Sequence, residues 1–221
     1  MSKGNKNKKL LIGCFNNSVI LTYVGLASSV CGMISIINGN SKYAMILMIV
    51  SGLCDLFDGT VARKCKRNNI QKEFGIQIDS LIDVVSFLIF PIILCLHHSY
   101  FTPIAIAVSV VYTVCGVTRL AWFNMYTEVD KNTVYYTGLP VTFISIIIPI
   151  WYTICTLIEQ SIFYLHNQII LWAILIVMAA LFVLDIPIKK PKGLSLVVIL
   201  LITLITLLTI IFIPDISHLA Y

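Results

Sequence analysis

Four aspartates lie between two long apolar stretches of the chain. Asp55 and Asp58 are three residues apart, and Asp79 and Asp83 are four residues apart, so each pair shares one face of a helix. If these helices pack as an antiparallel hairpin, the four carboxylates converge. Carboxylate oxygens are the ligands that hard divalent cations such as Mg²⁺, Mn²⁺ and Ca²⁺ prefer. The spacing therefore predicts a divalent-cation site.

Small residues accompany the aspartates on the same helical faces. Gly59 and Ala62 continue the stripe of the first pair, and Gly75 precedes the second pair by one turn. Side chains this small leave room for a ligand beside the carboxylates. No histidine lies near these positions, so zinc is not expected.

Two other interpretations of the acidic segment are open. The aspartates could balance Lys and Arg in a solvated loop, or they could line a proton or cation pathway. A solvated loop leaves the helical spacing and the glycines unexplained. An aspartate in the centre of a membrane helix costs about 2.5–3.5 kcal/mol, which favours a function that compensates for it.

The composition places the acidic segment in a membrane protein. Of 221 residues, 59% are hydrophobic and only 11% are charged, which is not typical of a soluble domain. We expect an all-α integral membrane protein, a helical bundle of about seven spans with six to eight possible, forming one domain over residues 1–221. The apolar runs are about 18–37, 42–62, 76–97, 101–123, 139–158, 167–187 and 193–213.

The distribution of Lys and Arg predicts the orientation. With seven alternating spans, nearly all basic loop residues fall on one side, which places the N-terminus and the basic segment 1–14 in the cytoplasm. The acidic segment then faces the cytoplasm, and we expect the plasma membrane as the location. The net charge of +5 requires only anionic lipid headgroups and no nucleic acid.

The acidic pattern resembles the signature of the CDP-alcohol phosphatidyltransferase family. The matching positions are Asp55, Asp58, Gly59, Ala62, Arg63, Gly75, Asp79 and Asp83. The resemblance implies a two-metal site with Mg²⁺ or Mn²⁺, a CDP-linked lipid donor, and an alcohol that displaces CMP. It also implies a homodimer.

Within that family, the surrounding segments are similar to the phosphatidylserine synthases. "FGIQIDSLIDVVSF" (74–87) and "TGLP" (137–140) match segments of that subfamily. "RLAWFN" (119–124) matches an Arg-Leu-Ala-Arg-Phe-Asn stretch, with Trp122 in place of the second arginine. The resemblance implies transfer of a phosphatidyl group from CDP-diacylglycerol to L-serine.

The resemblance also assigns roles to single residues. Asp55, Asp58 and Asp79 would hold metals. Asp83 would complete the metal site and act as the general base for the serine hydroxyl. The CDP-lipid would be bound by Gly59, Ala62, Arg63, Gly75, Asn17 and Thr22. For Asn17 and Thr22, a cap at the membrane interface is the alternative.

Arg119 is the candidate for binding a negative charge on the acceptor or on a lipid phosphate. It is the only arginine outside the segment 63–67, and an arginine within an apolar span is costly. The alternative is a snorkelling side chain that reaches the headgroups.

Other functions remain possible at this point. A related enzyme could use glycerol 3-phosphate or an inositol compound, but few basic residues near the fourth and fifth runs would bind the extra phosphate. A cation transporter is a further alternative, but the acidic motif occurs once and no internal repeat is visible. On the first run, Gly25, Ser28 and Gly32 form a small-residue face that would suit helix association.

Overall fold

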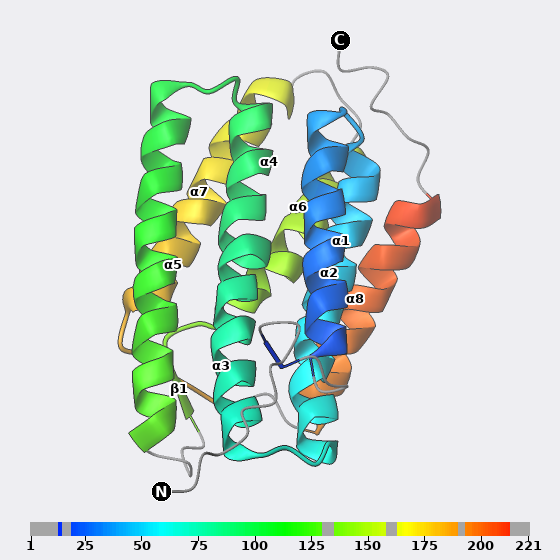
Figure 1. The fold of residues 1–221 in the computed structure, drawn as a ribbon. Coiled ribbons are helices and arrows are strands. Elements are labelled where there is room, and N and C mark those ends of the chain that lie inside the picture. Colours follow the sequence, from blue (N-terminus) through cyan, green and yellow to red (C-terminus); the bar gives the residue numbers. More distant parts are fainter. Residues whose placement is uncertain (1–12, 15–18, 130–134, 158–162, 190–192, 213–221) are drawn as a thin grey trace, which may run out of the picture.

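The structure, a computed structural model, is a bundle of long helices (Figure 1). It describes residues 13–14, 19–129, 135–157, 163–189 and 193–212. The elements in these ranges are α1 (Ile20–Ile37), α2 (Ser41–Lys64), α3 (Asn69–Asp83), the π-helix η1 (Val84–Ile89), α4 (Phe90–His98), α5 (Pro103–Val129), β1 (Tyr135–Thr137), the 3₁₀ turn η2 (Val141–Phe143), α6 (Ile144–Leu157), α7 (Phe163–Val183), β2 (Pro187–Lys189) and α8 (Leu194–Phe212).

Each of the seven predicted apolar runs contains a helix in its described residues, as expected for an all-α membrane protein. In the described residues, five helical stretches are long and apolar enough to cross a bilayer: Ile20–Ile37, Ser41–Lys64, Asn69–His98, Pro103–Met125 and Leu194–Phe212. Two further apolar helices, Val141–Leu157 and Asn167–Val183, are shorter. The helical membrane class is therefore confirmed, and the count of seven spans stays a prediction.

A short two-stranded ribbon departs from the purely helical expectation. β1 pairs antiparallel with β2, with Tyr136 opposite Ile188. The adjoining Gly138 has φ +73°, and a Cβ there would lie 2.6 Å from the carbonyl oxygen of Phe182. Only glycine fits this left-handed turn against the end of α7. The "TGLP" segment thus has a structural role, which is to dock the ribbon on α7.

Helix α1 uses its small residues for packing within the chain. A Cβ on Gly25 would lie 3.1 Å from Cβ of Cys54 on α2, and one on Gly32 would overlap the ring of Phe90 on α4. The expected association face of α1 therefore faces other helices of the same chain. These glycines let α2 and α4 approach α1 closely.

The helix that carries Asp79 and Asp83 changes its winding directly after Asp83. Residues 84–89 form the π-helix η1, and α4 follows with Pro91 in its first turn. In a continuous α-helix, the carbonyl of Phe87 would accept a hydrogen bond from the backbone N–H of residue 91, which proline lacks. The hydroxyl of Tyr112 on α5 donates to that carbonyl at 2.7 Å instead. A side chain from a distant helix thus satisfies the freed backbone group.

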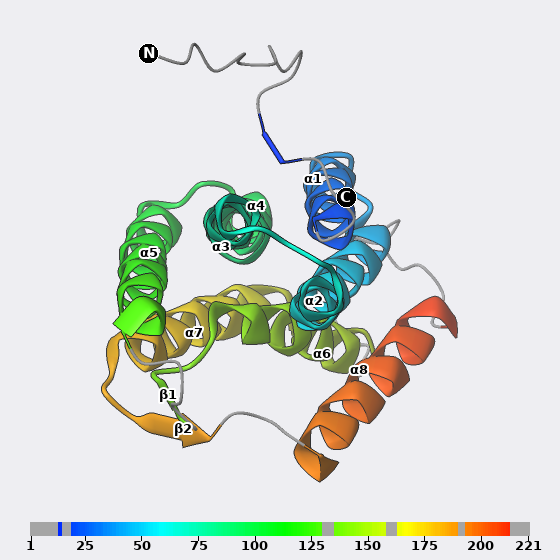
Figure 2. The same ribbon diagram turned by 60° about the horizontal axis from the view of Figure 1, so that its bottom comes forward.

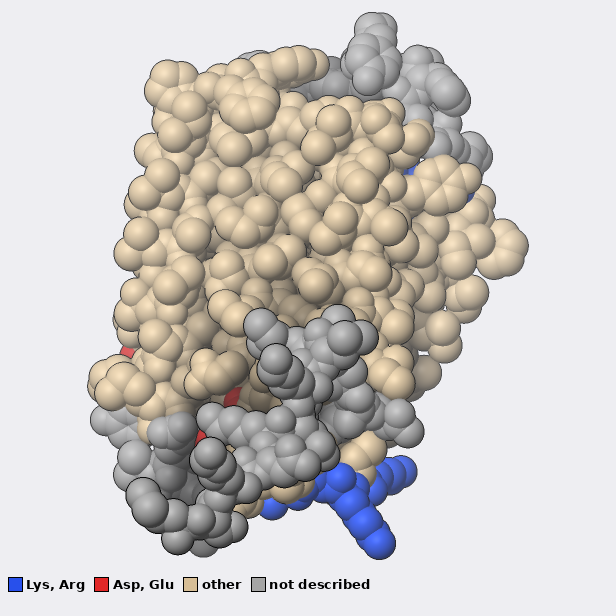
Figure 3. Space-filling view, in the orientation of Figure 1, with Lys and Arg blue, Asp and Glu red and all other residues tan. Residues whose placement is uncertain are grey.

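The acidic residues and the basic turn lie at the same end of the bundle. Figures 1 and 2 show α2 ending and α3 beginning there, and exposed Lys and Arg side chains gather at this end in Figure 3. Asn68 caps α3 by accepting from the N–H of Gln71 at 2.8 Å, and the Gln71 side chain accepts from the N–H of Asn68 at 3.0 Å. This capping box starts α3 directly after the basic turn.

The charge pattern predicts which end of the bundle faces the cytoplasm. In a variant without the seven native cysteines, a cysteine at Lys66 should react with a membrane-impermeant thiol reagent only after the membrane is opened. A cysteine at Asn38, in the turn at the opposite end, should react in intact cells. The reverse labelling pattern would show that the orientation is wrong.

Candidate metal and substrate site

Three helices surround the acidic residues. α2 packs extensively on α1, and α3 also contacts α1, whereas α2 and α3 have little direct contact with each other. The hairpin expected from the sequence is therefore wrong in one respect: α2 and α3 do not pack face to face. The separation leaves space for the carboxylates between them, and α1 supplies a third wall.

Three of the four carboxylates converge, and the fourth lies in the same pocket. Oxygens of Asp55, Asp58 and Asp79 all lie within 4.8 Å of one another. Asp83 is not part of that triplet, but it lines the same pocket as Asp55 and Asp58. The convergence that the spacing predicted is thus present, with Asp83 set apart from the other three.

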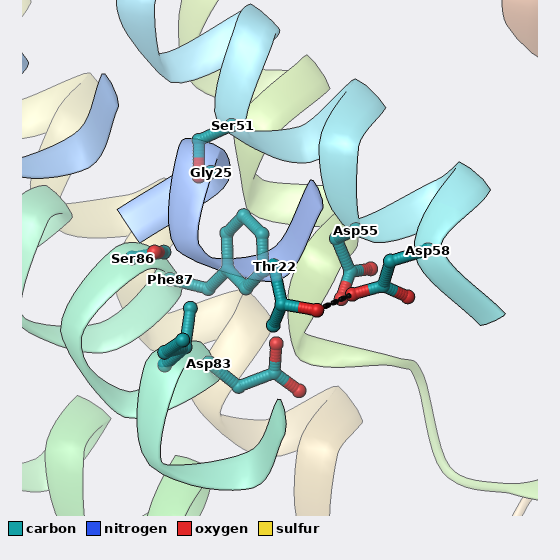
Figure 4. A pocket seen from close by; sticks show the side chains of 9 residues that line it. Thr22, Gly25, Ser51, Asp55, Asp58, Asp83, Ser86 and Phe87 are labelled. Carbon is teal, nitrogen blue, oxygen red and sulfur yellow. Dashed lines mark hydrogen bonds between the residues drawn. The ribbon is translucent and has the colours of Figure 1, made fainter. Parts of the chain in front are cut away.

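Helix α1 contributes a polar contact that orients one carboxylate. Thr22 Oγ1 donates a hydrogen bond to Oδ2 of Asp58 at 3.0 Å, and both side chains are buried (Figure 4). Thr22, predicted as a nucleotide-binding residue, therefore lies inside the site and fixes the position of a carboxylate.

A pocket opens between the three helices. Its lining residues are Thr22, Gly25, Ser51, Asp55, Asp58, Ile82, Asp83, Ser86 and Phe87. Its empty space of about 180 Å³ includes open solvent at the mouth, so the enclosed part is much smaller. The enclosed space suits a small polar group.

The sequence reasoning missed the polar residues on the inner side of this pocket. Ser51 precedes Asp55 by one helical turn and accepts a hydrogen bond from the hydroxyl of Ser29 at 2.7 Å. The available signal was the continuation of the aspartate stripe to Ser51, at the i−4 position. On α1, Thr22, Gly25 and Ser29 likewise share one face.

The site fits a divalent cation. No Lys, Arg or His is among the described residues that line the pocket, so the carboxylates lack a balancing charge there. Asp83 Oδ1 is buried and has no hydrogen-bond partner among the described residues. Like charges at these distances repel strongly in a partly buried site. An oxygen-only ligand set suits Mg²⁺ or Mn²⁺, so Asp55, Asp58 and Asp79 could hold such an ion.

The other residues expected to bind the CDP-lipid lie outside the pocket. Gly59 and Arg63 are exposed on α2, Ala62 is half-buried, and Gly75 is half-buried on α3. Arg63 Nη2 donates to Thr60 Oγ1 at 2.9 Å. Asn17 lies outside the described residues. These positions follow the aspartates toward the basic end of the bundle, where a larger substrate would approach.

Arg119 is buried on α5 and is not part of the pocket wall. Its guanidinium lies 5.1 Å from the ring centroid of Phe123, and the residue is 5% exposed. After Arg119 along α5, Asn124 Nδ2 donates a hydrogen bond to Ser80 Oγ of α3 at 2.8 Å. Before Arg119 along α5, Gly116 packs directly against Leu88 of η1. Because Arg119 lies between these contacts, its backbone is at the height of the segment from Asp83 to Ser86.

Comparison with known proteins gives a consistent result. The family model for CDP-alcohol phosphatidyltransferase matches residues 15–180. Archaetidylserine synthase of Methanothermobacter thermautotrophicus is 37% identical over 134 residues, which cover 60% of this chain and 56% of that protein. CDP-diacylglycerol–serine O-phosphatidyltransferase of Helicobacter pylori strain J99 is 35% identical over 151 residues, covering 64% and 59%.

A third relative carries the same name as the Helicobacter protein. The CDP-diacylglycerol–serine O-phosphatidyltransferase of Bacillus subtilis is 30% identical over 125 residues, which cover 54% of this chain and 67% of that protein. The matched regions thus span little more than half the length of the first two relatives. No solved structure matches the chain.

Cation binding should stabilise the folded protein. Adding Mn²⁺ or Mg²⁺ to purified protein should raise the midpoint of thermal unfolding, and EDTA should reverse the shift. An ion that binds only the folded state contributes about 2.7 kcal/mol at a concentration of 100 Kd. Asp58→Asn and Asp79→Asn should each remove most of the shift, because each deletes a charge from the converging triplet.

Asp185, an exposed aspartate beyond the end of α7, provides the matched control. Asp185→Asn should keep the full shift. A shift that persists in both Asp58→Asn and Asp79→Asn would show that the ion binds elsewhere.

Proposed function

The chain belongs to the CDP-alcohol phosphatidyltransferase family, and on that premise we propose that it transfers a phosphatidyl group from CDP-diacylglycerol to the hydroxyl of L-serine. The products are phosphatidylserine and CMP. The convergence of Asp55, Asp58 and Asp79 at the basic end of the bundle carries this proposal. The names of the relatives, all of them serine-type synthases, support L-serine as the acceptor.

The donor has a pyrophosphate, whose charge must be neutralised before CMP can leave. Divalent cations held by Asp55, Asp58 and Asp79, with Asp83 adjacent, would supply that neutralisation and polarise the phosphorus–oxygen bonds. Thr22 keeps the Asp58 carboxylate in place through its hydrogen bond. Arg63, one turn beyond Gly59 and exposed to solvent, offers a planar set of donors suited to a phosphate.

The small residues near the aspartates would admit the nucleotide. Gly59 and Ala62 lie on α2 directly after Asp58, so a flat base or ribose could approach that helix without a large side chain in the way. On α3, Gly75 lies one turn before Asp79, on the side of the basic turn that joins the two helices. Asn17 and Thr22 would complete this donor site from the segment around the start of α1.

Asp83 is the proposed general base. The serine hydroxyl oxygen forms a bond to the phosphorus that bears the diacylglycerol, and the bond from that phosphorus to the CMP oxygen breaks. The hydroxyl proton passes to the Asp83 carboxylate, and CMP departs with the electron pair of the broken bond. Asp83 suits this role because it lies beside the acidic triplet without being one of its three converging members.

Arg119 would bind a negative charge, either the carboxylate of L-serine or a lipid phosphate. Its burial on α5 and its height alongside Asp83 support this role. A guanidinium offers several donors in a fixed plane, which matches a carboxylate or a phosphate.

The proposed setting is the plasma membrane, with the active site facing the cytoplasm. The basic residues at the acidic end of the bundle support this orientation. A homodimer is part of the proposal because of the resemblance to the family, and chemical cross-linking in membranes would test it.

The decisive measurement is phosphatidyl transfer by purified protein with CDP-diacylglycerol, Mn²⁺ and isotope-labelled acceptors. We expect incorporation of L-serine in preference to glycerol 3-phosphate and inositol. Asp83→Asn should lower kcat by about 100- to 10,000-fold, the usual contribution of a general base. Asp185→Asn should retain the wild-type rate.

The possible outcomes separate the parts of the proposal. Preference for glycerol 3-phosphate or inositol would overturn the acceptor assignment and leave the family chemistry in place. Near-normal kcat in Asp83→Asn would overturn the role of Asp83 alone.

The contribution of Arg119 is measured separately. Arg119→Lys retains the charge but loses the planar donor set, so it should raise the KM for L-serine or for CDP-diacylglycerol. Loss of one charge-assisted hydrogen bond corresponds to about 1.5–3 kcal/mol, or roughly a 10- to 150-fold fall in kcat/KM. The substrate whose KM rises identifies the bound anion. Unchanged kinetics in both Arg119→Lys and Arg119→Gln would leave Arg119 as a membrane anchor.

A further inference from the structure

Two buried polar atoms in the pocket wall lack hydrogen-bond partners among the described residues. They are Oδ1 of Asp83 and Oγ of Ser86. Asp83 is 9% exposed and Ser86 is 1% exposed. Such groups are uncommon in folded proteins because an unsatisfied buried polar atom costs free energy. Both residues line the pocket between α1, α2 and α3 (Figure 4), which suggests that a ligand satisfies them.

Both residues belong to one continuous helical stretch. Asp83 is the last residue of α3, and Ser86 lies within the π-helix η1. Short π-helical segments are rare and occur frequently at functional sites. Ser86 and Phe87 follow Asp83 by three and four residues, so the three share one side of the helix, and all of them take part in the pocket wall.

The chemistry of the wall determines which group it would accept. Asp55, Asp58 and Asp83 make the described wall strongly acidic, and no positively charged side chain is among its residues. With a cation held by Asp55, Asp58 and Asp79, as proposed above, Asp83 is the negative charge that remains in this recess. A positively charged donor would be attracted to Asp83 Oδ1, could donate a second hydrogen bond to Ser86 Oγ, and would lie beside the ring of Phe87.

We infer that Ser86 Oγ and Asp83 Oδ1 bind the ammonium group of an amino-acid acceptor, and that Ser86 determines the preference for an acceptor with an amino group. The inference rests on the proposed function and specifies how its acceptor is recognised. The limited volume of the pocket agrees with a group of this size. With the ammonium held at Oδ1, the neighbouring hydroxyl of the same small molecule can reach the other oxygen of Asp83.

The test compares Ser86→Ala with wild type in steady-state kinetics and in competitive inhibition. The inhibitors are L-alanine, which is serine without its hydroxyl, and 3-hydroxypropionate, which is serine without its amino group. In Ser86→Ala, the KM for L-serine should rise about tenfold or more, since a hydrogen bond to a charged group is lost. The value of kcat should change by less than about threefold, because that bond is present before and during the reaction.

Inhibition distinguishes recognition of the amino group from general damage to the pocket. L-Alanine should inhibit Ser86→Ala at least several-fold more weakly than wild type, whereas inhibition by 3-hydroxypropionate should not change. Ser109→Ala is the matched control, because Ser109 is a buried serine on α5 that does not line the pocket. It should behave as wild type in both measurements. Thermal unfolding of each variant in the same detergent verifies folding.

Three outcomes would overturn the inference. Unchanged KM and unchanged L-alanine inhibition in Ser86→Ala would show that Ser86 binds no acceptor group, as expected if an ordered water fills the recess. Equal weakening of both inhibitors would show that the amino group is not what Ser86 recognises. A wild-type enzyme that does not use L-serine would overturn the proposed function itself, which the first two outcomes leave intact.

Discussion

Electrostatic repulsion among four carboxylates at one end of an apolar bundle is the constraint on which the rest of this structure depends. Asp55, Asp58 and Asp79 converge within 4.8 Å, and Asp83 lies beside them. Packing α2 directly against α3 would bring these charges together with no room for a counter-ion. The bundle instead keeps the two helices apart and packs both on α1. The space between them is what a cation and a substrate require.

Helix α1 is therefore part of the site as well as part of the core. Gly25 and Gly32 let α2 and α4 approach it closely. Thr22 donates to Asp58, and Ser29 donates to Ser51 about two turns deeper. The same helical face thus sets both the packing distance and the orientation of polar groups. A substitution by a larger residue on that face is expected to disturb geometry and chemistry together.

The π-helical segment η1 connects the site to the remainder of the bundle. It begins directly after Asp83, and the hydroxyl of Tyr112 on α5 satisfies the Phe87 carbonyl that Pro91 leaves without its usual donor. Asn124 of α5 is hydrogen-bonded to Ser80, between the two aspartates of α3. Helix α5, which carries Arg119, is thereby held in a defined register against the helix that carries Asp79 and Asp83.

Features that depend on local spacing could be predicted from the amino-acid sequence. Helical membrane segments follow from the length of the apolar runs, and the shared faces of Asp55 with Asp58 and of Asp79 with Asp83 follow from 3.6 residues per turn. The packing of the helices, by contrast, is visible only in the folded chain: α2 and α3 stand apart with both on α1, and Asp83 lies outside the triplet. The physical reason is that α1 carries large apolar residues on its exposed side, such as Ile20, Val24 and Ile34, so hydrophobic periodicity does not specify which of its faces meets α2 and α3. Small residues and hydrogen bonds between distant positions make that choice.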